Sequence, residues 1–415
     1  MTDLRGYAVV TAAYWGFTLT DGALRMLVLL HFHLLGFSPL DLASLFLLYE
    51  AMGIVTNLAG GWIAARFGLR LTLLMGLAIQ VFALLLLSAL DTGWSIGFSV
   101  FYVMVAQALS GVAKDLTKMS SKSAVKLVVK EDSGEILNTK PGLLFRWVAL
   151  LTGSKNALKG LGFLLGGLLL EGFGFQLSLW VLAFGLVLVL LGSFSLAERE
   201  LGRVKSSVGV RDLFSKTREI NLLSFSRVFL FAARDVWFVV ALPVFLYSAF
   251  GWSFEEVGAF MAVWVIGYGL VQAVVPRFTR GVVTPELGVK AAGFWGGTLA
   301  TVPLLIAMGI WMDTAASLYI LIIGLLVFGF VFAVNSSLHS YLIVGFSDAD
   351  KVALNVGFYY MANAVGRLGG TLLSGVVFQL AGLTACLVVS AVMVLIATVP
   401  LFLLSQYGEK SAEDS

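Results

Sequence analysis

The chain has 415 residues, of which 59% are hydrophobic and 12% charged, with a net charge of +3 and a mean hydropathy of +0.96. Soluble domains carry about 25% charged residues, so this composition excludes a soluble globular protein and predicts a multi-pass membrane protein. The single cysteine, Cys386, excludes an intramolecular disulfide and a multi-cysteine metal site. We expect no cleaved signal segment, no metal site and no cofactor.

The apolar residues fall into twelve long runs, each long enough to cross about 30 Å of hydrocarbon as a helix. The sequence therefore predicts an all-α membrane protein with about twelve transmembrane helices. In chain order the runs are Tyr7–Leu35, Leu42–Ala65, Leu71–Leu90, Trp94–Ala113, Leu143–Leu170, Leu177–Leu196, Ile220–Phe250, Val257–Val275, Val289–Trp311, Ala315–Val344, Val352–Leu380 and Ala385–Leu404.

Charge alternates between the connections that join these runs. The positive-inside rule places the connections that contain Lys or Arg, together with both termini, in the cytoplasm. We expect a multi-pass protein of the bacterial cytoplasmic (inner) membrane. The odd-numbered connections, 36–41, 91–93, 171–176, 251–256, 312–314 and 381–384, contain no Lys or Arg, whereas the even-numbered ones hold Arg66 and Arg70, Lys122 to Arg146, Arg199 to Arg218, Arg277 to Lys290, and Lys351.

A long charged connection lies between the sixth and seventh runs and divides the chain into two halves of six helices. Two pseudo-symmetric bundles are typical of transporters that bind their cargo near the bilayer midplane. We expect an N-terminal six-helix bundle at 1–197, a cytoplasmic linker at 198–219, a C-terminal six-helix bundle at 220–405 and a polar cytoplasmic tail at 406–415.

The first run carries two charges near its middle. Asp21 and Arg25 are four residues apart, so they share a helix face on which they can pair. Ionised groups at this depth are rare and normally face a water-filled cavity or a partner. Glu50, in the second run, is either a proton carrier or a buried acid that a neighbouring helix satisfies.

The loop between the second and third runs, Gly60–Arg70, resembles the loop motif of the major facilitator superfamily. Its glycines permit close packing and its arginines suit the cytoplasmic face. The usual acidic residue of the motif is replaced by Ala65, which weakens the expected gating role. We assign the gating loop to Gly61, Arg66, Gly68 and Arg70.

Lysines extend from the fourth run and interrupt the fifth. Lys114 and Lys118, with Asp115 beside them, line either an inner vestibule or the cytoplasmic surface. Lys155 and Lys159 share one helix face. Lys155 either faces the cavity or reaches the cytoplasmic surface through its long stem, whereas Lys159 lies deeper.

The second half repeats this pattern of buried charge. Arg234 and Asp235 lie near the middle of the seventh run, and Pro243 follows them and should kink the helix. His339, four residues after Asn335, faces either the cavity or a packed interface. One face of the eleventh run is polar, as a cavity wall or as an interhelical seam, through Asn355, Tyr359, Asn363, Arg367 and Thr371.

Cations outnumber acids at these deep positions. Arg25, Lys159, Arg234 and Arg367 exceed Asp21 and Asp235, and the shallower Lys114, Lys118 and Lys155 exceed Asp115. An unpartnered cation costs at least about 2.5–3.5 kcal/mol on insertion into a bilayer. Because arginine and lysine suit phosphate and carboxylate oxygens, we predict a small polyanionic cargo such as a phosphate ester or sugar acid.

Several strings of the chain are long and unusual: Leu19–Arg25 (LTDGALR), Lys114–Ser123 (KDLTKMSSKS), Leu151–Gly160 (LTGSKNALKG), Ala233–Pro243 (ARDVWFVVALP) and Val265–Gln272 (VIGYGLVQ). They resemble one family, the organoarsenical efflux permeases (ArsJ-type) of the major facilitator superfamily, and the resemblance runs from Tyr14 to about Gln272. It implies export of 1-arseno-3-phosphoglycerate, which a glyceraldehyde-3-phosphate dehydrogenase makes from arsenate, and hence arsenate resistance.

We therefore predict a monomeric secondary transporter that works by alternating access, needs no nucleic acid and contacts membrane lipid. Arg25, Lys159, Arg234 and Arg367 are the main anion-binding candidates, with Asn363 and Tyr359 beside them; Lys114, Lys118 and Lys155 are secondary, and Asp21, Asp235 and Asp115 are charge-pairing or proton-coupling groups. Organic-phosphate or sugar-acid uptake is the alternative. An enzyme is disfavoured because no nucleophile constellation is present, and an anion sensor is the remaining alternative of another class.

Overall fold

The computed structural model describes residues 2–67, 69–91, 93–131, 141–196, 217–278, 284–312, 314–347 and 352–413. Side chains are described over less of the chain, and those at 2–7, 60–69, 119, 122–131, 141–152, 196, 276–278, 344, 352–354 and 406–413 are left out. Residues 198–216 of the expected linker and most side chains of the expected basic connections lie outside these described residues.

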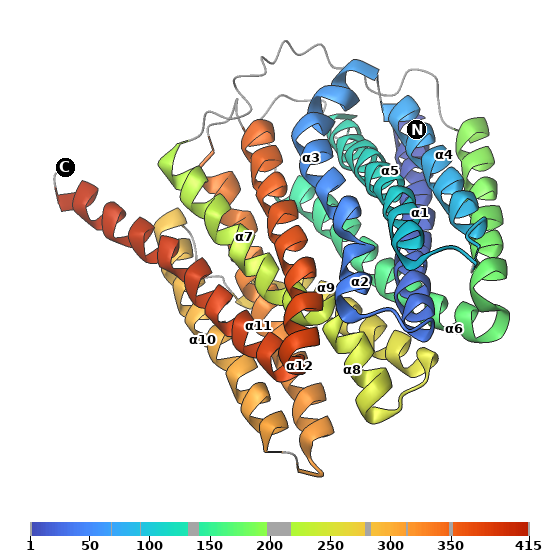
Figure 1. Ribbon diagram of the computed structural model, residues 1–415. Helices are drawn as coiled ribbons and strands as arrows, with labels where there is room; N and C mark the ends of the chain where they lie inside the picture. The colour runs from blue at the N-terminus through green and yellow to red at the C-terminus, as the bar shows by residue number, and fades with distance from the viewer. Residues whose placement is uncertain are drawn as a thin grey trace. The chain divides into compact units, whose positions relative to one another are not determined.

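The described residues are almost entirely α-helical, as the composition predicts (Figure 1). The helices are α1 (Thr2–Leu34), α2 (Pro39–Ser44), α3 (Leu47–Phe67), α4 (Leu69–Ser88), α5 (Ile96–Glu131), α6 (Pro141–Leu196), α7 (Arg218–Phe238), α8 (Ala241–Phe250), α9 (Phe254–Phe278), α10 (Pro285–Trp311), α11 (Ser317–Gly345) and α12 (Val352–Glu413).

Two of these helices each contain two apolar runs joined at a glycine. Gly174 in α6 has φ 70° and Gly382 in α12 has φ 72°, a left-handed backbone that glycine adopts readily. Both glycines lie in connections expected from the sequence. Nine stretches of the described residues are long and apolar enough to span a membrane. The twelve apolar runs lie almost entirely in helices, so the all-α membrane fold is confirmed.

The chain forms two compact units. Unit 1 comprises 1–32, 55–208 and 253–269, and unit 2 comprises 33–54, 209–252 and 270–415. Each unit thus combines segments from both halves of the sequence. The division into two six-helix bundles stays a prediction.

In unit 1, glycines bring α1 and α6 into backbone contact. A Cβ atom on Gly22 would lie 2.6 Å from the carbonyl oxygen of Lys159 and 3.2 Å from the Cα of Gly162. A Cβ atom on Gly162 would in turn clash with the carbonyl oxygen of Leu19. Such close approach of helix backbones is a common use of small residues in membranes. The two helices that carry Arg25 and Lys159 are therefore held at a fixed short distance.

Replacing Gly162 with alanine should destabilise the protein by roughly 1–3 kcal/mol, because the added methyl group pushes α1 and α6 apart. The thermal unfolding midpoint in detergent measures the change. Gly185→Ala is the matched control on the same helix, since its Cβ meets nothing within 4 Å, and the better helix propensity of alanine should stabilise it slightly. Equal midpoints for the two variants would contradict the packing described.

In unit 2, α7 and the first part of α12 run parallel and in close contact. A Cβ atom on Gly366 would clash with the Val228 carbonyl oxygen, and one on Gly370 would lie 2.8 Å from the Ala232 carbonyl oxygen. Further along, the Ser374 hydroxyl accepts hydrogen bonds from the backbone N–H groups of Val240 and Ala241. This register sets the polar residues of α7 against the polar face of α12.

The interruption between α7 and α8 falls at Val239 and Val240, shortly before Pro243. A proline inside a helix removes a backbone donor and crowds the preceding turn, so a break here follows from the sequence. The kink expected at Pro243 is thus present as a break between two helices. At this break, the Ser374 hydroxyl is the acceptor for two backbone N–H groups, those of Val240 and Ala241.

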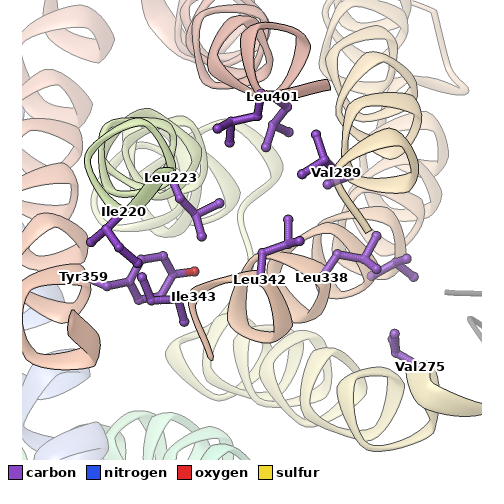
Figure 2. Packing of buried hydrophobic residues seen from close by; sticks show 12 residues of the cluster. Ile220, Leu223, Val275, Val289, Leu338, Leu342, Ile343, Tyr359 and Leu401 are labelled. Atoms are coloured by element: carbon purple, nitrogen blue, oxygen red, sulfur yellow. The ribbon is translucent and has the colours of Figure 1, made fainter. Parts of the chain in front are cut away.

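An apolar cluster of buried residues includes side chains of both α7 and α12 (Figure 2). Figure 2 shows the Tyr359 ring beside Ile343. Tyr359 thus belongs both to this cluster and to the polar face of α12. The cluster comprises Ile220, Leu223, Val275, Val289, Ala292, Val334, Leu338, Leu342, Ile343, Tyr359, Leu401 and Leu404.

Candidate functional site

Four charged side chains form one buried network in unit 2. Arg367 Nη2 on α12 lies 2.5 Å from Glu50 Oε1 on α3, and Arg367 Nε lies 3.4 Å from Asp235 Oδ2 on α7. Arg234, next to Asp235, places Nη2 2.5 Å from Asp235 Oδ1. The two acids are 1% exposed and the two arginines 15%. Because apolar helices surround it, this network is an electrostatic centre at which each charge depends on its partners.

Glu50 changes the charge count that the sequence suggested. With Glu50 and Asp235 against Arg234 and Arg367, the network carries no net charge. Glu50 is the buried acid satisfied by a neighbouring helix, one of the two roles considered for it. The described contacts therefore give Arg234 and Arg367 protein counter-charges, so a cargo anion would reach them by displacing a carboxylate.

Arg227, which the sequence analysis did not single out, lies one helical turn before Phe231 on α7 and is 5% exposed. Its Nε donates to Asn363 Oδ1 at 3.2 Å, and Nη1 donates to the Ser336 hydroxyl at 3.0 Å and carbonyl at 3.3 Å. Its guanidinium carbon lies 4.0 Å from the Phe231 ring centroid and 4.8 Å from that of Tyr359. These partners are neutral, and none of the described carboxylates forms an ion pair with it.

The spacing of Arg227 and Arg234 is the signal that sequence reading could have used. Seven residues are two helical turns, so both arginines lie on one face of α7, about 10 Å apart along the axis. Phe231 lies between them, with the guanidinium of Arg234 4.9 Å from its ring centroid. Both guanidinium groups thus lie within cation–π distance of the same ring.

The polar stripe of α12 contacts protein along its length. Asn363 accepts from Arg227, Arg367 donates to Glu50, and Asn355 donates to the Ser347 hydroxyl at 3.1 Å. Tyr359 and Thr371 are 2% and 0% exposed. These contacts are those of an interhelical seam. Through Asn363 and Arg367, the stripe connects Arg227 to the ion pair between Arg367 and Glu50.

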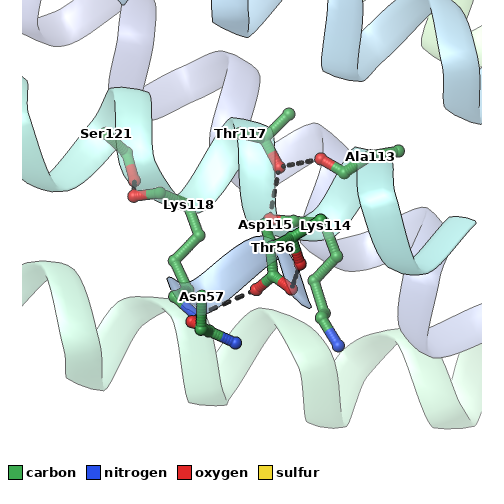
Figure 3. A network of polar contacts seen from close by, with 8 residues as sticks. All are labelled: Thr56, Asn57, Ala113, Lys114, Asp115, Thr117, Lys118 and Ser121. Atoms are coloured by element: carbon green, nitrogen blue, oxygen red, sulfur yellow. Dashed lines mark hydrogen bonds and ion pairs between the residues drawn. The ribbon is translucent and has the colours of Figure 1, made fainter. Parts of the chain in front are cut away.

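A second polar network lies in unit 1, between α3 and α5 (Figure 3). The buried carboxylate of Asp115 accepts from the Thr56 hydroxyl at 2.5 Å and from Lys118 Nζ at 2.9 Å. Lys118 Nζ also donates to Asn57 Oδ1 at 2.5 Å. Figure 3 shows Lys114 and Lys118 on either side of Asp115. Asp115 thus forms an ion pair with Lys118 inside the helical packing of the unit, and its role in transport stays a prediction.

The remaining candidates of unit 1 lie on α1 and α6. Asp21 is 7% exposed, whereas Arg25, Lys155 and Lys159 are partly buried. Lys159 Nζ lies 5.8 Å from the Phe163 ring centroid. Because the glycine contacts fix α1 against α6, Arg25 and Lys159 belong to one rigid helix pair. Their role in cargo binding stays a prediction.

The expected gating loop is described only in part. Arg70 Nη2 donates to the Phe194 carbonyl oxygen at 2.9 Å, and its guanidinium lies 5.5 Å from the Phe194 ring centroid. Arg70 thereby ties the start of α4 to the end of α6. Gly68 and the side-chain surroundings of Gly61 and Arg66 lie outside the described residues.

The described residues contain no group of three or more His, Cys, Asp or Glu side chains that could hold a metal ion. Two cavities, one in each unit, lie away from the charged networks. One of about 560 Å³ is lined by α10 and the end of α12, including Val289, Phe294 and Phe402. Another of about 490 Å³ is lined by α4 and α6, including Leu71 and Phe194. Both are apolar and suit lipid chains better than an anion.

Comparison with known proteins identifies the fold. No protein-family model matches the sequence, and no curated protein matches it. Solved structures do resemble it. A mutant of the nucleoside transporter NupG is 15% identical with a TM-score of 0.71, over 97% of this chain and 98% of that one. The human organic anion transporter MFSD10 (TETRAN) is 18% identical with a TM-score of 0.63, over 96% and 99%.

A POT family transporter in complex with 5-aminolevulinic acid is 17% identical with a TM-score of 0.73, over 97% of this chain and 96% of that one. At these identities the likeness shows the fold alone. The chain therefore has the major facilitator fold that the sequence predicts. Because proteins of this fold carry cargoes as different as nucleosides and organic anions, the cargo must be argued from the side chains.

Proposed function

We propose that this protein is a secondary transporter that moves a small organic polyanion across the membrane. The observation that carries the proposal is the row of buried arginines on one face of α7 and α12: Arg227, Arg234 and Arg367. Arginine offers a planar fork of N–H donors that matches phosphate and carboxylate oxygens. Buried cations are costly in a bilayer, and a cargo that needs them explains why they are there.

Neutralised arginines can still serve a transport cycle. An anion that enters unit 2 competes with Glu50 and Asp235 for the guanidinium groups, and the displaced carboxylate then takes up a proton or another partner. This exchange links cargo binding to proton movement, which is the coupling we propose. Asp21 and Asp115 are the corresponding candidates of unit 1, together with the cations Arg25, Lys114, Lys118, Lys155 and Lys159.

The cargo that best fits is 1-arseno-3-phosphoglycerate, which carries a phosphate and an arsenate ester. The resemblance of the sequence to organoarsenical efflux permeases supports this choice, and so does the supply of buried cations. Export from the cytoplasm would give arsenate resistance in a bacterium whose glyceraldehyde-3-phosphate dehydrogenase makes the ester. Uptake or exchange of an organic phosphate or sugar acid would use the same cations and is the alternative.

Arsenate resistance tests the cargo. A bacterial strain that lacks its own arsenate efflux should grow in arsenate when it expresses this protein together with a glyceraldehyde-3-phosphate dehydrogenase, and should contain less arsenic. Expression of the dehydrogenase alone is the control, because it makes the ester without removing it. Unchanged growth and arsenic content with the pair would contradict arsenical export and leave the uptake alternative.

A further inference from the structure

We propose that Arg227 is a second binding position for an oxyanion group of the cargo, separate from the position at Arg234 and Arg367. The inference rests on the proposed function and gives Arg227 a binding position of its own within it. Arg227 differs from the other two arginines because its described partners are an amide, a hydroxyl, a carbonyl and two aromatic rings. An anion is therefore not in competition with a carboxylate here.

No carboxylate among the described residues pairs with Arg227, so its charge has no counter-charge there. Residues of the apolar cluster precede it on α7, and Tyr359 of the same cluster lies against its guanidinium. Neutral acceptors and ring faces orient a guanidinium and soften the loss of water, but they do not cancel its charge. A buried cation held in place by neutral groups is preorganised for an incoming anion.

Hydrogen-bonding capacity remains open around Arg227. A guanidinium has five N–H donors, and the described partners occupy Nε and Nη1, so Nη2 is available to an acceptor. On α11, the buried His339 Nδ1 has no hydrogen-bond partner among the described residues. His339 lies three residues after Ser336, whose hydroxyl accepts from Arg227, so the two side chains share one face of α11.

These open atoms match an oxyanion. A phosphate, arsenate or carboxylate oxygen accepts from Arg227 Nη2 and, in the tautomer that carries the proton on Nδ1, from His339 Nδ1. Arg227 lies two turns from Arg234 on the same face, about 10 Å along the helix. That spacing suits a short carbon chain with an anionic group at each end.

Binding of radiolabelled 3-phosphoglycerate to the purified protein in lipid nanodiscs tests this assignment. The phosphate and carboxylate of this probe stand in for the two anionic ends. Arg227→Gln should weaken binding at least about tenfold, because a charge-assisted contact is lost. Arg227→Lys keeps the charge, loses the fork and should weaken binding several-fold. Arg218→Gln, an exposed cation at the start of the same helix, should bind like the wild type.

The thermal unfolding midpoint of each variant, measured without probe, separates binding from folding. A purely structural arginine would lower the midpoint and leave the affinity of the folded protein unchanged. Unchanged affinity in either Arg227 variant that folds overturns this inference alone. Failure of the wild type to bind 3-phosphoglycerate overturns it together with the proposed function.

Discussion

Replacing Glu50 with glutamine should lower the free energy of unfolding by about 3–5 kcal/mol, because it leaves Arg367 without its nearest counter-charge. Glu50 is 1% exposed and its Oε1 lies 2.5 Å from Arg367 Nη2. The remaining acid, Asp235, is 3.4 Å from Arg367 Nε and already pairs with Arg234. Unfolding in mixed detergent micelles measures the effect.

The double variant Glu50→Gln/Arg367→Gln separates the ion pair from other effects. Once both charges are gone, no uncompensated cation remains, so the double variant should be more stable than the sum of the single changes implies. Glu255→Gln, an exposed acid at the start of α9, should change stability by no more than about 0.5 kcal/mol. Additive losses in the double variant would show that the pair contributes nothing to folding.

Arg234→Gln should reduce the initial rate of anion transport in proteoliposomes by at least about 100-fold while the protein stays folded, because the proposed cargo would lose its charge-assisted hydrogen bonds to the guanidinium group. The change deletes a charged fork that three aromatic rings hold in position. Their ring centroids lie 4.9 Å (Phe231), 5.8 Å (Phe238) and 5.7 Å (Phe332) from the guanidinium carbon of Arg234.

Lysine at position 234 keeps the charge without the fork, so Arg234→Lys should retain a fraction of the rate. Lys290→Gln, an exposed cation on α10, should transport like the wild type. A wild-type rate in a folded Arg234→Gln protein would remove Arg234 from the binding position. The buried charge of Arg234 would then need an explanation other than cargo binding.

The helices could be predicted from the sequence because their signals are local. Apolar runs of membrane length are contiguous, and Gly174, Gly382 and Pro243 mark the breaks through their own backbone geometry. Each of these features depends on a few neighbouring residues. Packing of α1 against α6 is less local, because the glycines on the two helices that permit it are far apart in the sequence.

The charge network could not be predicted in the same way. Glu50 and Arg367 are 317 residues apart, and nothing local to either residue identifies the other. A count of charges by depth treated Glu50 as isolated and so exaggerated the cation surplus at Arg234 and Arg367. Which acid meets which arginine is decided by how α3, α7 and α12 pack, which depends on the whole of unit 2.

Arg227 is a different case, because a sequence signal existed. It lies seven residues before Arg234 in an apolar helix, which places both arginines on one face. It lies seven residues after the start of the apolar run at Ile220, whereas Arg234 and Asp235 lie near the middle of that run. Only the contacts with Asn363, Ser336 and Tyr359 show that its guanidinium is turned into the protein.

Counterflow in proteoliposomes tests the central claim, which is that buried arginines in the α7–α12 seam serve a negatively charged cargo. Vesicles loaded with unlabelled 3-phosphoglycerate should accumulate the radiolabelled compound, and an excess of external glycerol, which is neutral, should not compete. No counterflow of 3-phosphoglycerate, or counterflow that glycerol suppresses equally well, would contradict the account.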